Sequence, residues 1–191
     1  RILNQGVAEV TEDRGERELS VLRYELETFI CEGQYQKGMD RVLGSYLSCL
    51  GSNQPEQKGV WISGFYGSGK SHLAKMLRIL WTDYTFGDGV TARKLAHLPG
   101  DIQDHLRELS TASRRDEAGL FAAAGKMGGG GSESVRLVLL GILYRSAGFP
   151  EQYGQARLLL WLRDEGKLDS FTKELAARGR DLRKELHNLF V

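Results

Sequence analysis

Apolar residues recur at steps of three and four positions in several stretches of the chain, a spacing that predicts amphipathic helices. One such stretch covers residues 19–29, and a second follows Gly38 and closes at Gly51. The most regular stretch runs from Lys70 to about Trp81. Its apolar residues fall at i, i+3, i+4 and i+7 and are Leu73, Met76, Leu77 and Leu80.

The last third of the chain is also predicted to be helical. Residues 133–146 are apolar on nearly every side, so we expect this helix to be buried on most sides, with Ser132 as its N-cap. Pro150 suits the first position of the next helix, which should end near Gly166. One or two further helices are expected in residues 169–191.

Three short apolar stretches bounded by turn residues predict β-strands instead. They are residues 6–10, 60–63 and 120–124. The middle stretch, Val-Trp-Ile-Ser, has the composition of a buried strand and stands directly before a glycine-rich segment. Strands alternating with helices predict an α/β fold.

We therefore expect an α/β P-loop NTPase core, AAA+-like, with a parallel sheet, a helical N-terminal lead and a helical C-terminal tail. The expected domains are a strand-helix lead over residues 1–52, the P-loop core over residues 53–148 and a helical segment over residues 149–191. The chain begins with Arg1 and ends on an apolar stretch, so we expect a fragment of a larger protein.

The glycine-rich segment from Gly64 to Ser71 matches the P-loop pattern G-x-x-x-x-G-K-[ST] at every position. Glycines let the backbone wrap closely around a phosphate, and the N–H groups that open the next helix point at the same anion. The lysine supplies a charge for the β- and γ-phosphates, and the serine hydroxyl a ligand for Mg²⁺. The predicted cofactors are ATP and Mg²⁺, with Ser71 as the metal ligand and nucleotide contacts at Gly64, Gly67, Ser68, Gly69, Lys70, Ser71 and His72.

Two candidate contacts near this motif leave alternatives open. His72 could approach the phosphates or ribose, or it could pack between helices. A second glycine cluster, residues 125–131, could bring Lys126 to an anion, or it could be a flexible connection. Neither alternative is decided by the sequence.

Hydrolysis would also need a carboxylate near Mg²⁺, usually at the end of an apolar strand. The apolar run 158–162, followed by Asp164 and Glu165, is the one candidate, but Arg163 interrupts it. The helix signals at Pro150 and near Gly166 favour a helix over a Walker B strand. The catalytic residues of this chain are therefore left unassigned, and whether it hydrolyses ATP stays open.

Composition adds limits rather than a function. The chain has 41% hydrophobic residues and a net charge of +1, so charge alone neither requires nor excludes nucleic acid. No apolar run is long enough for a membrane span and no signal peptide is evident, so we expect a cytoplasmic protein. Cys31 and Cys49 have no metal or disulfide spacing and are expected to be reduced thiols in helices.

The residues around the motif extend it beyond a bare P-loop. The stretch from Gly59 to Leu73 reads Gly-Val-Trp-Ile-Ser-Gly-Phe-Tyr-Gly-Ser-Gly-Lys-Ser-His-Leu. It resembles the BrxC family of ATPases from bacteriophage-exclusion (BREX) systems and, more distantly, the related PglY proteins. Trp61, Phe65 and His72 flank or interrupt the P-loop pattern and match that family too.

This resemblance implies an ATP-binding module of a large prokaryotic anti-phage ATPase, in which the nucleotide state drives the conformation or assembly of a DNA-acting complex. It implies a DNA methyltransferase and associated defence factors as partners, DNA as an indirect partner, an oligomer and no membrane. Two other functions are left open by the residues themselves. They are a small P-loop kinase and a nucleotide-binding scaffold that does not turn over.

Overall fold

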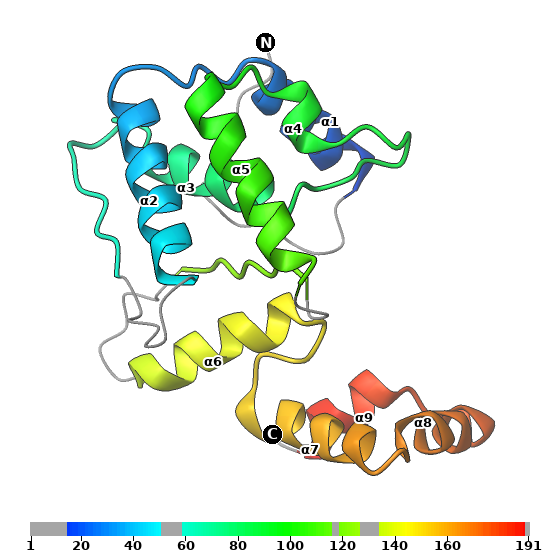
Figure 1. Ribbon diagram of the computed structural model, residues 1–191. Helices are drawn as coiled ribbons and strands as arrows, with labels where there is room; N and C mark the ends of the chain where they lie inside the picture. Colours follow the sequence, from blue (N-terminus) through cyan, green and yellow to red (C-terminus); the bar gives the residue numbers. More distant parts are fainter. Residues whose placement is uncertain (1–14, 51–58, 116–118, 127–133, 190–191) are drawn as a thin grey trace. The chain divides into compact units, whose positions relative to one another are not determined.

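The computed structural model describes residues 15–50, 59–115, 119–126 and 134–189. The chain divides into two compact units, residues 1–122 and residues 123–191 (Figure 1). In the described residues of both units the regular elements are helices, and the only β-type pairing is an isolated antiparallel bridge between Thr85 and Thr91.

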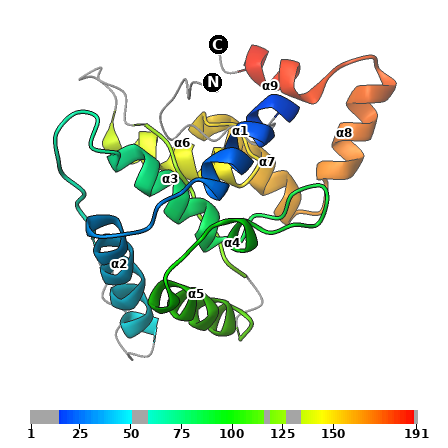
Figure 2. The same ribbon diagram turned by 90° about the horizontal axis from the view of Figure 1, so that it is seen from above.

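The first unit contains α1 to α5. Their bounds are α1 Glu16–Glu27, α2 Gln34–Leu50, α3 Lys70–Trp81, α4 Ala92–Leu95 and α5 Gly100–Ser113. Helices α2 and α5 lie side by side in both views, and α3 and α4 also pack against this group (Figures 1 and 2). The fully buried side chains of the described part of this unit share one continuous apolar core and include Leu26, Met39, Leu43, Met76, Leu80, Ile102, Leu106 and Leu109.

Helix α3 shows why the sequence folds this way locally. Its buried positions are Leu73, Met76, Ile79 and Leu80, which fall on one face at helical spacing. The helix predicted from Lys70 to about Trp81 is therefore confirmed at both ends.

One arginine ties the end of α3 to α5. The guanidinium of Arg93 donates to the carbonyl oxygens of Leu80 (2.7 Å), Trp81 (2.9 Å) and Leu106 (2.8 Å) and to the hydroxyl of Ser110 (2.6 Å). The last carbonyl groups of a helix have no partner within the helix, so Arg93 satisfies two of them on α3. Burial lowers the pKa of Arg93 from its ordinary value.

The second unit contains α6 Val135–Ser146, α7 Tyr153–Asp164, α8 Leu168–Ala177 and α9 Leu182–Leu189. Its core is small and is built around Leu159, Leu162 and Leu186. Helix α7 ends before Gly166, whose φ of 66° allows the Lys167 N–H to bond back to the carbonyl of Leu162. The expected end of this helix near Gly166 is therefore confirmed.

The predicted parallel-sheet α/β core is wrong. Residues 60–63 and 120–124 form no strand, and no sheet exists in the parts of the chain that the structure describes. Val60, Trp61 and Ile62 have the side chains that favour strands, but a strand is stabilised by pairing with neighbours that local sequence cannot supply. The strand predicted at 6–10 lies outside the described residues.

The helix predicted over 133–146 exists as α6, but its predicted burial is wrong. Of its residues only Gly141 is buried, and four large side chains are about half exposed, namely Val135, Leu137, Leu139 and Leu143. Within its own unit α6 packs on α7, so one face is covered. The proposed cap Ser132 lies outside the described residues, and the helix follows Ser134.

Candidate functional site

The P-loop residues form a tight turn that leads directly into α3. Gly67 and Gly69 have φ values of 79° and 80°, which residues with a side chain rarely adopt. Gly69 is the N-cap of α3, and no side chain caps this helix end. The first N–H groups of a helix lack acceptors within the helix, so this end of α3 offers donors to an anion.

Lys70 folds back across the turn. Its ammonium donates to the carbonyl oxygens of Gly64 (2.9 Å) and Phe65 (2.7 Å) and lies 3.4 Å from the hydroxyl oxygen of Ser68. The charge is thereby held over the loop formed by its own motif. The structure thus brings the first and last parts of the motif together around one cation.

The other predicted site residues differ in exposure. Ser68 and Ser71 are exposed, whereas His72 is partly buried and its ring lies edge-on to Phe29 at a centroid distance of 5.7 Å. Burial lowers the pKa of His72, Glu25 opposes this and Lys75 adds to it. His72 therefore packs against Phe29 at the side of α3, and its contact with a nucleotide stays a prediction.

A partly buried ion pair fixes α3 on α1 one turn beyond the loop. The Lys75 ammonium lies 2.5 Å from a carboxylate oxygen of Glu25, and their side chains are only 15% and 8% exposed. An ion pair withdrawn from water is screened less than a surface pair. It therefore ties the helix that carries the P-loop to its neighbour.

Two aromatic residues that the sequence did not point to also contact the site. The hydroxyl of Tyr35, near the start of α2, donates to the carbonyl oxygen of Ser68 at 3.1 Å. Phe29 lies edge-on to Tyr35 at a centroid distance of 6.2 Å as well as to His72. Phe29 lies 35 and Tyr35 29 residues before Gly64, the first residue of the motif, so only the tertiary fold brings them there.

The aromatic side chains that precede and interrupt the loop face solvent. Trp61 and Phe65 are each 90% exposed, and Tyr66 is fully exposed. Trp61 and Phe65 are two of the residues on which the resemblance to the BREX ATPases depends. A run of exposed apolar side chains of this kind is unusual for a surface without a partner.

The remaining candidates lie in the second unit. Lys126 is in an irregular segment after Gly125, and residues 127–131 of that glycine cluster lie outside the described residues. The run 158–162 lies within α7, Asp164 ends that helix and Glu165 is its C-cap. The helix interpretation of this run is therefore confirmed over a Walker B strand.

Both cysteines are free thiols, as expected, but only Cys49 lies in a helix. Cys31 is buried in the linker between α1 and α2, and burial raises the pKa of its thiol to about 11. Among the described residues, no three His, Cys, Asp or Glu side chains group together as a metal site would require.

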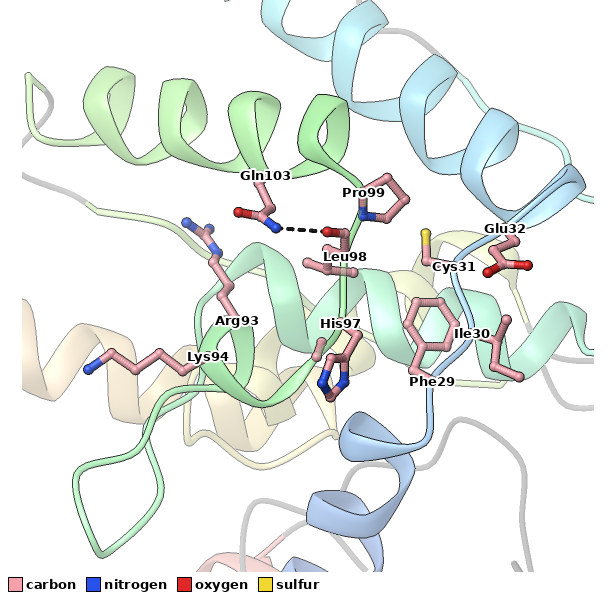
Figure 3. A pocket seen from close by; sticks show the side chains of 11 residues that line it. Phe29, Ile30, Cys31, Glu32, Arg93, Lys94, His97, Leu98, Pro99 and Gln103 are labelled. Atoms are coloured by element: carbon pink, nitrogen blue, oxygen red, sulfur yellow. Dashed lines mark hydrogen bonds between the residues drawn. The ribbon is translucent and has the colours of Figure 1, made fainter.

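The first unit has a pocket of about 640 Å³ between the α1–α2 linker and the segment from α4 to α5 (Figure 3). Phe29 and Cys31 line it from the α1–α2 linker, and His97 and Gln103 line it from the α4–α5 side. The Gln103 amide donates to the carbonyl oxygen of Leu98 and closes one wall (Figure 3). Phe29 therefore belongs both to this pocket and to the contacts of His72.

No protein-family model, no curated protein and no solved structure matches this chain. The resemblance to the BREX ATPases therefore stays a prediction from the motif and its flanking residues. Over the portion of the chain that is described, none of the helices combines the length and the apolar character needed to cross a membrane.

Proposed function

We propose that residues 64–71 bind the phosphates of a nucleoside triphosphate, with ATP and Mg²⁺ as the physiological ligand. The observation that carries this proposal is the conformation of the motif itself. Gly67 and Gly69 turn the backbone at positive φ, Lys70 lies over that turn, and α3 starts there without a side-chain cap. Phosphate oxygens accept hydrogen bonds from backbone N–H groups of such a turn and from an ammonium group held beside it.

The residues also fit a magnesium ion in the form that P-loops use. Mg²⁺ keeps several waters and takes one or two protein ligands together with the phosphates, so it needs no dedicated cluster of carboxylates. The exposed hydroxyl of Ser71, in the first turn of α3, is the protein ligand that the motif provides. When bound, the ion would neutralise part of the phosphate charge beside Lys70.

The proposal is tested by equilibrium binding of Mg²⁺–ATP to the chain and to the Lys70→Ala variant. Charge-assisted hydrogen bonds contribute about 1.5–3 kcal/mol, so the variant should bind on the order of 10- to 100-fold more weakly. Lys184→Ala, which removes an exposed lysine of α9, is the matched control and should bind like the wild type. Equal affinity of the wild type and Lys70→Ala, or no binding by the wild type at millimolar ATP, would refute phosphate binding at this loop.

We further propose that nucleotide binding serves an ATP-driven switch in a DNA-acting anti-phage complex. This rests on the residues that resemble the BREX ATPases. The exposed Trp61 before the loop and Phe65 within it suit a surface that other proteins cover. ATP turnover by the protein with a methyltransferase and DNA, lost in Lys70→Ala, would support the switch. Tight ATP binding without turnover under those conditions would leave a non-hydrolysing scaffold.

A further inference from the structure

The start of α2 contacts the P-loop through the hydroxyl of Tyr35. This hydroxyl donates to the carbonyl oxygen of Ser68 at 3.1 Å across 33 residues of sequence. We propose that Tyr35 is a positioning residue, which fixes the orientation of the Ser68–Gly69 peptide for phosphate binding. The inference rests on the proposed function of the loop and adds a residue from outside the motif to it.

The hydrogen bond from Tyr35 also sets the direction of the Gly69 N–H group, because this N–H and the Ser68 carbonyl belong to one peptide. In a planar trans peptide the C=O and N–H groups point in opposite directions. A hydrogen bond that holds the Ser68 carbonyl toward Tyr35 therefore directs the N–H of Gly69 away from it. A phosphate-binding loop works through the direction of such N–H groups.

The flanking glycines explain why an external hydrogen bond is needed. Ser68 stands between Gly67 and Gly69, and both have positive φ. Glycine visits positive and negative φ with similar ease, so a peptide beside two glycines can rotate at little cost. The Tyr35 hydroxyl selects one of the available orientations.

The tyrosine can reach the loop only because Gly69 has no side chain. A Cβ atom at Gly69 would lie 1.6 Å from the Tyr35 hydroxyl oxygen and 2.9 Å from the ring carbon that bears it. Gly69 is thus required by this close approach as well as by its φ of 80°.

The position of the Tyr35 ring does not depend on its hydroxyl. The ring packs against the core of the first unit and lies edge-on to Phe29, which is itself only 4% exposed. Tyr35→Phe should therefore keep the ring in place and remove the one hydrogen bond. The Ser68 carbonyl is exposed, so water can replace the lost donor in the ligand-free protein.

The test is calorimetric titration of the wild type, Tyr35→Phe and a matched control with two probes, Mg²⁺–ATP and Mg²⁺–tripolyphosphate. Tripolyphosphate carries the phosphates without a nucleoside, so it reports on the loop alone. We expect Tyr35→Phe to weaken both probes by the same factor, about three- to tenfold, which corresponds to one net hydrogen bond. Its thermal midpoint without ligand should stay at the wild-type value.

The control is Tyr153→Phe, which removes the hydroxyl of a half-exposed tyrosine on α7 of the second unit and should change neither affinity. Wild-type affinity in Tyr35→Phe would overturn the positioning role and leave the proposed function standing. A loss with ATP but not with tripolyphosphate would assign Tyr35 to the nucleoside, and a large fall in the ligand-free midpoint would assign it to the core. Either result overturns the positioning role, whereas a wild type that binds neither probe overturns the proposed function itself.

Discussion

The two units of this chain are both helical, but they bury their apolar residues very differently. In the first unit, seventeen described side chains join one buried cluster that draws on α1 to α5, whereas the cluster of the second unit has three. Polar side chains reinforce the first core, through Arg93 and through the Glu25–Lys75 ion pair. The P-loop is thus carried by the unit that has the larger core and the stronger polar ties.

The difference shows how similar apolar content can lead to different packing. Helix α6 is rich in leucine, yet its apolar residues point in all directions and only Gly141 is buried. Helix α3 places its apolar residues on one face, and that face is buried at every expected position except the partly buried Leu77. The direction of the apolar residues therefore decides burial more than their number does.

The largest effect that would sharpen this comparison comes from matched core truncations. Leu80→Ala, at a site with no exposure, should cost about 3–5 kcal/mol of unfolding free energy, and Leu186→Ala, in the smaller core, about 2 kcal/mol. Urea unfolding with unit-specific fluorescence measures both. A Trp161→Phe background leaves Trp61 and Trp81 to report on the first unit.

The result that would break the comparison is an equal cost at the two leucines. It would mean that the second core is packed as completely as the first, despite its few buried residues. For the Leu186 variant the reporter is Trp161, in a background that carries Trp61→Phe and Trp81→Phe.

A smaller effect is expected from the polar ties. Glu25→Gln leaves Lys75 in a poorly exposed site without its ion pair and should destabilise the first unit by about 1–3 kcal/mol. Glu174→Gln breaks the pair with Arg178 on α8, where both side chains are more than 60% exposed, and should cost no more than about 0.5 kcal/mol. Chemical unfolding of the two variants would contradict the comparison if Glu174→Gln were the more damaging change.

The smallest expected effect is a pH dependence of the first unit. Because burial lowers the pKa of His72, the unfolded chain binds a proton there more readily than the folded chain does. The stability of the first unit should therefore be highest above the ordinary histidine pKa of about 6.5 and should fall as the pH drops below it.

His72 alone cannot change the free energy of unfolding by more than about 1.4 kcal/mol per pH unit. The His72→Gln variant should lose this pH dependence. Replacement of His187, an exposed residue of α9, is the matched control and should leave the first unit's curve in place. Urea midpoints measured between pH 7 and pH 5 test this, and a slope that survives in His72→Gln would place its origin elsewhere.

The sequence predicted the features of this molecule that depend on near neighbours. The helix from Lys70 to Trp81 and the helix that ends before Gly166 follow from spacing and end signals within one segment. The glycine turn at Gly67 and Gly69 likewise follows from the motif, because positive φ is a property of single residues.

Features that depend on distant neighbours were missed or wrong. Residues 60–63 have strand-forming side chains, but no sheet partner exists for them in the described residues. The local preference of these residues therefore led to a wrong strand prediction. Tyr35 and Arg93 act through hydrogen bonds to carbonyl groups on other elements, and backbone carbonyls leave no mark in the sequence. Nothing in the residues next to Tyr35 pointed to a contact with the P-loop.

The attachment of α3 at both ends has a consequence for how fast a ligand could bind. Tyr35 holds the turn before the helix, and Arg93 holds the carbonyl groups at its far end. When only a small fraction of molecules has the competent conformation, the apparent affinity falls by that fraction and association slows. If the conformation that these contacts hold is the one that a ligand binds, diffusional encounter rather than rearrangement would limit the association rate.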